Sequence, residues 1–143
     1  MMTSNGKQDT IVATLVPDHE RLEFLPRHFG THMLTVESYI YTQFGNLCPA
    51  YMGGYWHFYE LSNGGCYLAP HGETFPLIHT GNYFDATVSG DVAGIIASLF
   101  AFSQLSFHFE QAPFCSVLTN HFHFLRDYAA HHPYAALIYR AID

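Results

Sequence analysis

Apolar positions recur at helical spacing in two long segments of the chain. From Met33 to Leu47 they fall on one face of a helix, which Pro49 terminates. From Ser89, a typical N-cap residue, an almost entirely apolar helix is predicted to run to about Phe107. A helix that is apolar on most of its faces belongs at the centre of a protein core. The sequence therefore predicts one amphipathic helix and one buried helix.

Shorter helices are predicted toward both ends of the chain. Asp18 is the predicted N-cap of a helix that carries Leu22 and Leu25. Pro26 is expected to end or kink this helix, and Gly30 to close the segment. Two further apolar stripes each predict a helix. The first stripe consists of Leu118, Phe122, Leu125 and Ala129. The second predicts a short final helix and consists of Tyr134, Ile138 and Ala141.

The middle of the chain changes to extended patterns. Tyr55–Leu61 is dense in aromatic residues that favour strands, and Gly65–Ala69 is a second extended run. An Asn-Gly turn within residues 62–64 predicts that the two form an antiparallel hairpin. Tyr83–Val88 is predicted as a third strand, because two strands alone are only marginally stable, and Pro70–Gly81 is predicted as a loop. The result is an α+β fold in which a small antiparallel sheet of about three strands packs with several helices.

Length and composition indicate one compact domain. A chain of 143 residues with 49% hydrophobic residues is long enough to bury a core without disulfides, and it does not match a disordered or collagen-like composition. Residues 1–10 are polar and are predicted to be a flexible tail. Residues 11–143 are predicted to form a single domain, which begins with a short apolar stretch, Ile11–Val16, that Pro17 stops.

The excess of acidic over basic residues limits the kinds of partner the protein can have. Five Lys and Arg residues against 12 Asp and Glu residues argue against nucleic-acid binding, which requires a basic patch to neutralise phosphates. The acids are also too few for a protein that imitates DNA. A duplex carries one charge per ~1.7 Å, so a globule roughly 35 Å across would need on the order of 20 charges on one face.

Cysteine usage and hydropathy predict a cytoplasmic protein. Cys48, Cys66 and Cys115 are odd in number and widely spaced, as expected of reduced, buried thiols. The first ten residues contain no apolar segment of a secretory signal. The charge-free run Val92–Phe109 is shorter than the ~20 residues of a membrane span and is interrupted by polar residues, so no membrane association is expected.

Candidate catalytic and metal-binding patterns are weak. Of the 11 histidines, His121 and His123 lie about 200° apart around a helix and cannot hold one ion together. His71 and His79 could converge in the predicted loop, and with Glu73 they define an alternative function, a small His- and acid-dependent enzyme of hydrolase type. No nucleophile elbow, zinc-protease or phosphate-loop motif is present. We therefore predict no catalytic residues, no metal and no cofactor, with Cys66 in a packing role.

Several long segments resemble one known family. Their sequences are ATLVPDHERLEFLPRHFG at Ala13–Gly30, YMGGYWHFYELSNGGCYLAP at Tyr51–Pro70, SGDVAGIIASLFAFSQLSF at Ser89–Phe107, LRDYA at Leu125–Ala129 and AID at the end. On these motifs the chain resembles the ArdB/KlcA antirestriction protein family over nearly its whole length. The departures are small: Gly90 and Val92 stand where the family more often has Ala, and Cys66 stands where an aromatic residue is common.

The resemblance implies a function. Proteins of this family inhibit type I restriction-modification enzymes, and they are carried by plasmids, prophages and genomic islands to protect incoming DNA. The resemblance implies inhibition by binding a protein, either the type I complex or a factor that controls it, without DNA mimicry, catalysis or direct contact with nucleic acid. The subunit contacted and the oligomeric state remain open.

Candidate contact residues come from the most specific motif. Trp56 and Phe58 lie on one face of the predicted strand, and Tyr55, His57 and Tyr59 lie on the other. One face should be core. The face with Tyr55, His57 and Tyr59 is a candidate contact surface, because exposed aromatic residues are frequent interface anchors. The alternative is that both faces pack under helices.

Three polar residues complete the candidate set, each with a structural alternative. Asn63 is a candidate contact that would also serve as the turn residue, since Asn tolerates positive φ. Asp91 would also serve as an acid in the first turn of a helix. Asp143, at the end of the matched region, has no evident structural role. Arg126 and Asp127 are interpreted as a solvated helix face.

Overall fold

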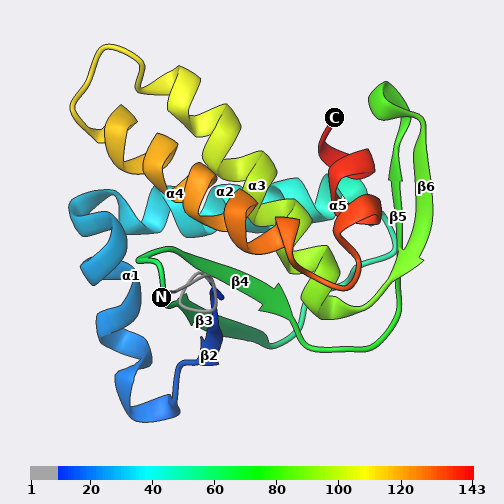
Figure 1. Ribbon diagram of the computed structural model, residues 1–143, viewed down its shortest axis with the longest axis horizontal. Helices are drawn as coiled ribbons and strands as arrows, with labels where there is room; N and C mark the ends of the chain where they lie inside the picture. The colour runs from blue at the N-terminus through cyan, green and yellow to red at the C-terminus, as the bar shows by residue number, and fades with distance from the viewer. Residues whose placement is uncertain (1–9) are drawn as a thin grey trace, which may run out of the picture.

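The computed structural model describes residues 10–143, and its elements form an α+β fold in a single domain, as the sequence predicts (Figure 1). Nearly all of the predicted flexible tail, residues 1–9, lies outside the described residues. In chain order the elements are β2 (Ala13–Leu15), α1 (Arg21–Phe29), α2 (Met33–Leu47), β3 (Trp56–Leu61), β4 (Cys66–Pro70), β5 (Phe75–His79), β6 (Phe84–Val88), α3 (Gly90–His108), α4 (Phe114–Ala130) and α5 (Ala135–Ile142).

The strands form two antiparallel sheets rather than one. The predicted hairpin is confirmed, with β3 paired to β4, but the third strand of this sheet is β2, which pairs with the outer edge of β3. The predicted strand Tyr83–Val88 exists as β6, yet it pairs with β5 in a separate two-stranded sheet. The prediction of a loop over Pro70–Gly81 is wrong, because β5 lies within it.

Both corrections have a physical reason. β2 has only three residues, too few to show the alternation that marks a strand. β5 contains Pro76, which cannot donate a hydrogen bond and therefore argues against a strand in sequence. A two-stranded sheet consists of edge strands alone, and at an edge a proline can face away from the ladder, so Pro76 is tolerated there opposite Thr87.

The predicted first helix also differs. α1 continues through Pro26 to Phe29, and Asp18 does not cap it, since it begins a preceding 3-10 turn with no side-chain cap. Proline cannot donate a hydrogen bond to the carbonyl four residues earlier, that of Leu22, which lies at the surface with 92% exposure. Gly30 closes the helix as predicted, with a φ of 55° that favours glycine.

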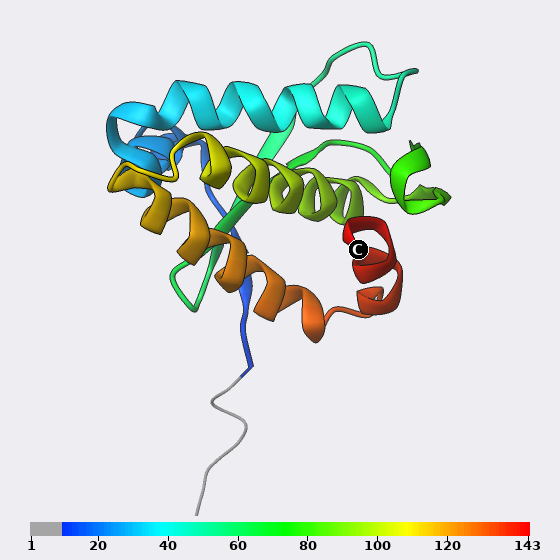
Figure 2. The same cartoon turned by 90° about the horizontal axis from the view of Figure 1, so that it is seen from above.

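The α3 helix is the centre of the core. It packs against α2 and α4 on its two sides and against β4, so that the three helices lie in a row when the molecule is seen from above (Figure 2). Ser89 caps it as predicted, its hydroxyl accepting a hydrogen bond from the Val92 amide at 3.2 Å. α3 is the one helix in residues 10–143 long and apolar enough to cross a membrane, and 67% of its apolar window is buried inside the protein.

The contact between α3 and β4 is unusually close and depends on glycine. A Cβ atom at Gly94 would lie 2.3 Å from the carbonyl oxygen of Leu68 and 2.4 Å from the Cα of Ala69. Four residues further along the same helix, the buried hydroxyl of Ser98 lies 3.3 Å from the Leu68 amide nitrogen. At the start of α3, Gly90 donates a backbone hydrogen bond to Gly72. These contacts fix the N-terminus of α3 beside the end of β4.

Candidate functional site

An open pocket of about 520 Å³ lies beside the hairpin of β3 and β4, at the N-terminus of α3, and is here called the β3–β4 pocket. Successive strand residues point to opposite faces, so His57 and Tyr59 turn toward the pocket while Trp56 and Phe58 are buried on the other side. The pocket is lined by His57, Tyr59, Ala69, Pro70, His71, Gly72, Glu73, Ser89 and Asp91.

Two histidines form a pair on one side of the pocket. Nε2 of His57 lies 3.0 Å from Nδ1 of His71, which immediately follows β4. Burial, and then the proximity of His71, lower the pKa of His57 below its usual value. At neutral pH His57 is therefore uncharged, with one ring nitrogen as donor and the other as acceptor.

A fixed carboxylate lies at the other side. Asp91, in the first turn of α3, accepts hydrogen bonds from the Tyr67 hydroxyl at 2.5 Å and from Nε2 of His132 at 2.9 Å. Burial acts to raise the pKa of Asp91, but the hydrogen bonds from His132 and Tyr67 outweigh it and hold the pKa below its usual value. Tyr67 is 1% exposed and stacks on Tyr59 at 4.9 Å. The negative charge of Asp91 is thus held in a defined position.

Replacing Asp91 by asparagine is expected to lower the free energy of unfolding at neutral pH by about 1–2 kcal/mol, because a partly exposed charged acceptor is lost. A carboxylate with a depressed pKa stabilises the fold above its unfolded value of about 4, and this contribution disappears as pH falls through the folded value. The difference between D91N and wild type should therefore vanish in acid. Denaturant titration across pH measures it, with the exposed Asp127→Asn as control.

Three of the predicted contact residues meet in this pocket: His57, Tyr59 and Asp91. Tyr55 lies at its rim, since its ring is 5.2 Å from that of His57, and it is 51% exposed. Its other neighbour is Arg21 of α1, whose guanidinium lies 4.7 Å from the ring centre. The predicted division of the strand into a core face and a second face is confirmed, and this second face is only partly covered.

The other two predicted residues lie elsewhere. Asn63 occupies the hairpin turn, where its side chain accepts from the Gly65 amide and donates to the Phe124 carbonyl of α4. Asn63 is thus a turn residue, as considered for it, but it does not adopt the expected positive φ, which falls on Gly64 at 99°. Its side chain also links the turn to α4. Asp143 is exposed directly after α5, and its amide caps the helix by donating to Tyr139.

Sequence reasoning missed Tyr67 and His132, which position Asp91. The hairpin register places Tyr67 opposite Tyr59, so the predicted turn could have located Tyr67 on the same face as Tyr59. His132 had no such signal, because it reaches Asp91 through the packing of α4 and α5 around α3, 41 residues away in sequence.

The pocket offers polar recognition more readily than catalysis. His71 and Glu73 of the enzyme hypothesis line it, but His79 lies at the end of β5, stacked on Phe100 at 5.0 Å and accepting from the Asn82 amide. Among the described residues that line the pocket, Ser89 carries the one aliphatic hydroxyl, and that oxygen is occupied in capping α3. The His57–His71 pair and the Asp91 carboxylate remain as hydrogen-bonding groups.

Known proteins resemble this chain along its full length. A family profile described as Antirestriction protein matches residues 49–143. Two Escherichia coli proteins called Antirestriction protein KlcA are 44% and 45% identical, and they cover 97% and 99% of this chain and 99% and 100% of their own length. A solved structure reported for the KlcA and ArdB proteins, with a novel fold and antirestriction activity against type I DNA restriction systems in vivo but not in vitro, is 42% identical with a TM-score of 0.89 over 100% of both chains.

Proposed function

The chain belongs to the antirestriction protein family, and we propose that it inhibits type I restriction-modification enzymes in the cell. The observation that carries this proposal is the full-length match, in sequence and in fold, to proteins with that activity in vivo. The same activity was absent in vitro for those proteins, so we expect this chain also to require a component or condition of the living cell.

The mechanism we propose is contact with a protein. Imitation of a duplex across a domain of this size would need on the order of 20 charges on one face, and the whole chain has 12 Asp and Glu residues. In the β3–β4 pocket two carboxylates, Glu73 and Asp91, stand among imidazole and aromatic groups. This mixed surface suits a protein partner, and the shortage of basic residues argues against direct DNA binding.

The proposed contact surface is the β3–β4 pocket with Tyr55 at its rim. Half-exposed aromatic rings beside a fixed charge resemble the anchors that contribute most to protein interfaces. The partner is the type I complex or a factor that controls it, and the site of action is the cytoplasm. Catalysis is not part of the proposal, because the enzyme hypothesis required His79 in the pocket and the structure does not place it there.

Expression of this protein is expected to raise the plating efficiency of unmodified phage by several orders of magnitude on cells with an active type I system. The same phage on cells that lack restriction should plate equally with and without the protein. Soluble expression without any rise in plating would contradict the proposed function.

A further inference from the structure

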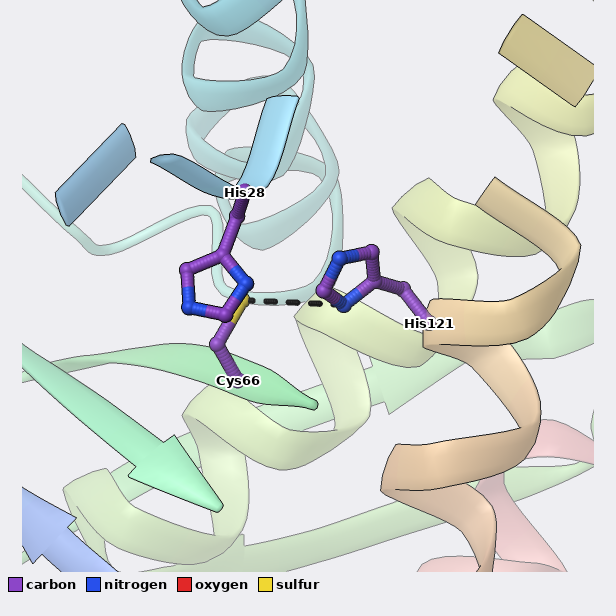
Figure 3. A group of neighbouring side chains, drawn as sticks. All are labelled: His28, Cys66 and His121. Atoms are coloured by element: carbon purple, nitrogen blue, oxygen red, sulfur yellow. Dashed lines mark hydrogen bonds between the residues drawn. The ribbon is translucent and has the colours of Figure 1, made fainter. Parts of the chain in front are cut away.

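A second cluster of polar side chains lies outside the β3–β4 pocket, on the opposite face of the hairpin. His28 of α1, Cys66 of β4 and His121 of α4 bring a ring nitrogen, a thiol sulfur and a ring nitrogen within 4.8 Å of one another. The three side chains converge from three elements that are distant in sequence (Figure 3). Cys66 is fully buried and His121 is 6% exposed, with the rings of Phe29 and Phe102 beside it.

The cluster is arranged as metal ligands are. Nε2 of His28 is 2.7 Å from a carboxylate oxygen of Glu60, which leaves Nδ1 as its free nitrogen. Nδ1 of His121 lies 3.9 Å from Sγ of Cys66. In metal sites the remote ring nitrogen of a ligating histidine is typically held by a carboxylate or a backbone carbonyl, and Glu60 holds that of His28 in this way.

We propose that His28, Cys66 and His121 bind one zinc ion through Nδ1, Sγ and Nδ1. Zn–S and Zn–N bonds of about 2.3 and 2.0 Å in tetrahedral geometry place sulfur and nitrogen about 3.5 Å apart. The observed 3.9 Å between Cys66 and His121 needs only a small contraction. Three protein ligands leave a fourth position for water.

The ligand chemistry selects zinc over harder cations. One thiolate and two imidazoles suit a borderline-soft ion, whereas magnesium and calcium require oxygen ligands. Binding replaces the thiol proton of Cys66 by the metal and releases that proton to solvent. The carboxylate of Glu60, behind His28, supplies a negative charge near the cation.

The cluster is nearest to solvent at His28 and Glu60. The side chain of His28 is 9% exposed, and that of Glu60 is 32% exposed and also pairs with Arg27. We expect an ion to enter the cluster on this side, past Glu60.

The test uses cobalt(II) as a spectroscopic substitute for zinc in the full-length protein. In a variant with Cys48→Ala and Cys115→Ala, Cys66 is the sole thiol of the chain. We expect one Co²⁺ per chain, a thiolate-to-cobalt charge-transfer band, and displacement of the cobalt by zinc. If the double variant does not fold, either single replacement gives the same spectrum when compared with wild type.

Ligand variants then identify the site. Cys66→Ala is expected to abolish the charge-transfer band and to weaken zinc binding by roughly 100-fold or more, beyond the effect typical of losing an outer partner. His123→Ala, on the exposed side of α4, should change neither. Circular dichroism confirms that each variant is folded. Folded wild type without a thiolate band at stoichiometric cobalt, or a band that persists in C66A, would overturn the proposal.

Discussion

Replacement of Tyr55 and His57 together by alanine is expected to abolish protection of unmodified DNA in restricting cells while the protein stays folded. Tyr55 is 51% exposed and His57 lies on the partly covered face of β3, so their removal takes little from the core. If Tyr55 and His57 anchor the partner, the double variant loses the binding free energy of two interface hot spots. These contribute about 2–4 kcal/mol each, a decrease in affinity of roughly 30- to 700-fold per residue.

The control for this variant is Tyr83→Ala. Tyr83 is 94% exposed and lies between β5 and β6, on the separate two-stranded sheet. Plating of unmodified phage should fall to the unprotected level with the Tyr55 and His57 double variant and remain at the wild-type level with Y83A. Full protection by the double variant, at equal soluble expression, would show that the β3–β4 pocket is not the contact surface.

The second large effect concerns stability. Gly94→Ala places a Cβ atom 2.3 Å from a backbone oxygen and 2.4 Å from a backbone carbon, and neither backbone can move without separating α3 from β4. Overpacking of this kind costs about 3 kcal/mol, a large part of the 5–15 kcal/mol that stabilises a typical domain. We expect a correspondingly lower denaturation midpoint.

Gly45→Ala is the matched control for that substitution. Gly45 lies within α2, and a Cβ atom there meets nothing within 4 Å. Alanine is the better helix former, so G45A should increase stability by about 0.5–1 kcal/mol. Urea titration of both variants measures whether each substitution raises or lowers the free energy of unfolding. If G94A is as stable as G45A, the close approach of α3 to β4 does not hold in solution.

Elements with strong local signals were predictable from the sequence. The helical spacing within Met33–Leu47 matches α2, the Asn-Gly turn matches the β3–β4 hairpin, and Ser89 caps α3. The errors concern interactions that no local pattern encodes. β2 becomes a strand by pairing with β3 some 46 residues away, and Pro76 is accommodated because its sheet has only edges.

The candidate site follows the same division. The two-residue period of a strand placed His57 and Tyr59 on one face, and the structure confirms that placement. His57 and Tyr59 lie near Asp91 because α3 approaches β4 closely. Gly90 and Gly94, in the first half of α3, permit this approach, and no spacing in the sequence predicts it. Likewise, the sequence argument against an ion shared by His121 and His123 considered only residues of one helix. In the structure His121 lies beside Cys66, which is 55 residues away in sequence.

Site-specific photo-crosslinking in restricting cells is the most direct test of inhibition through a protein contact. A photoreactive phenylalanine analogue replaces Tyr55 in one strain and Tyr83 in another, and both side chains are exposed aromatic rings. We predict a covalent adduct with a subunit of the type I complex, or with a protein that controls it, from position 55 alone. Undiminished protection with no protein adduct at position 55, or with a DNA adduct there, would contradict the account.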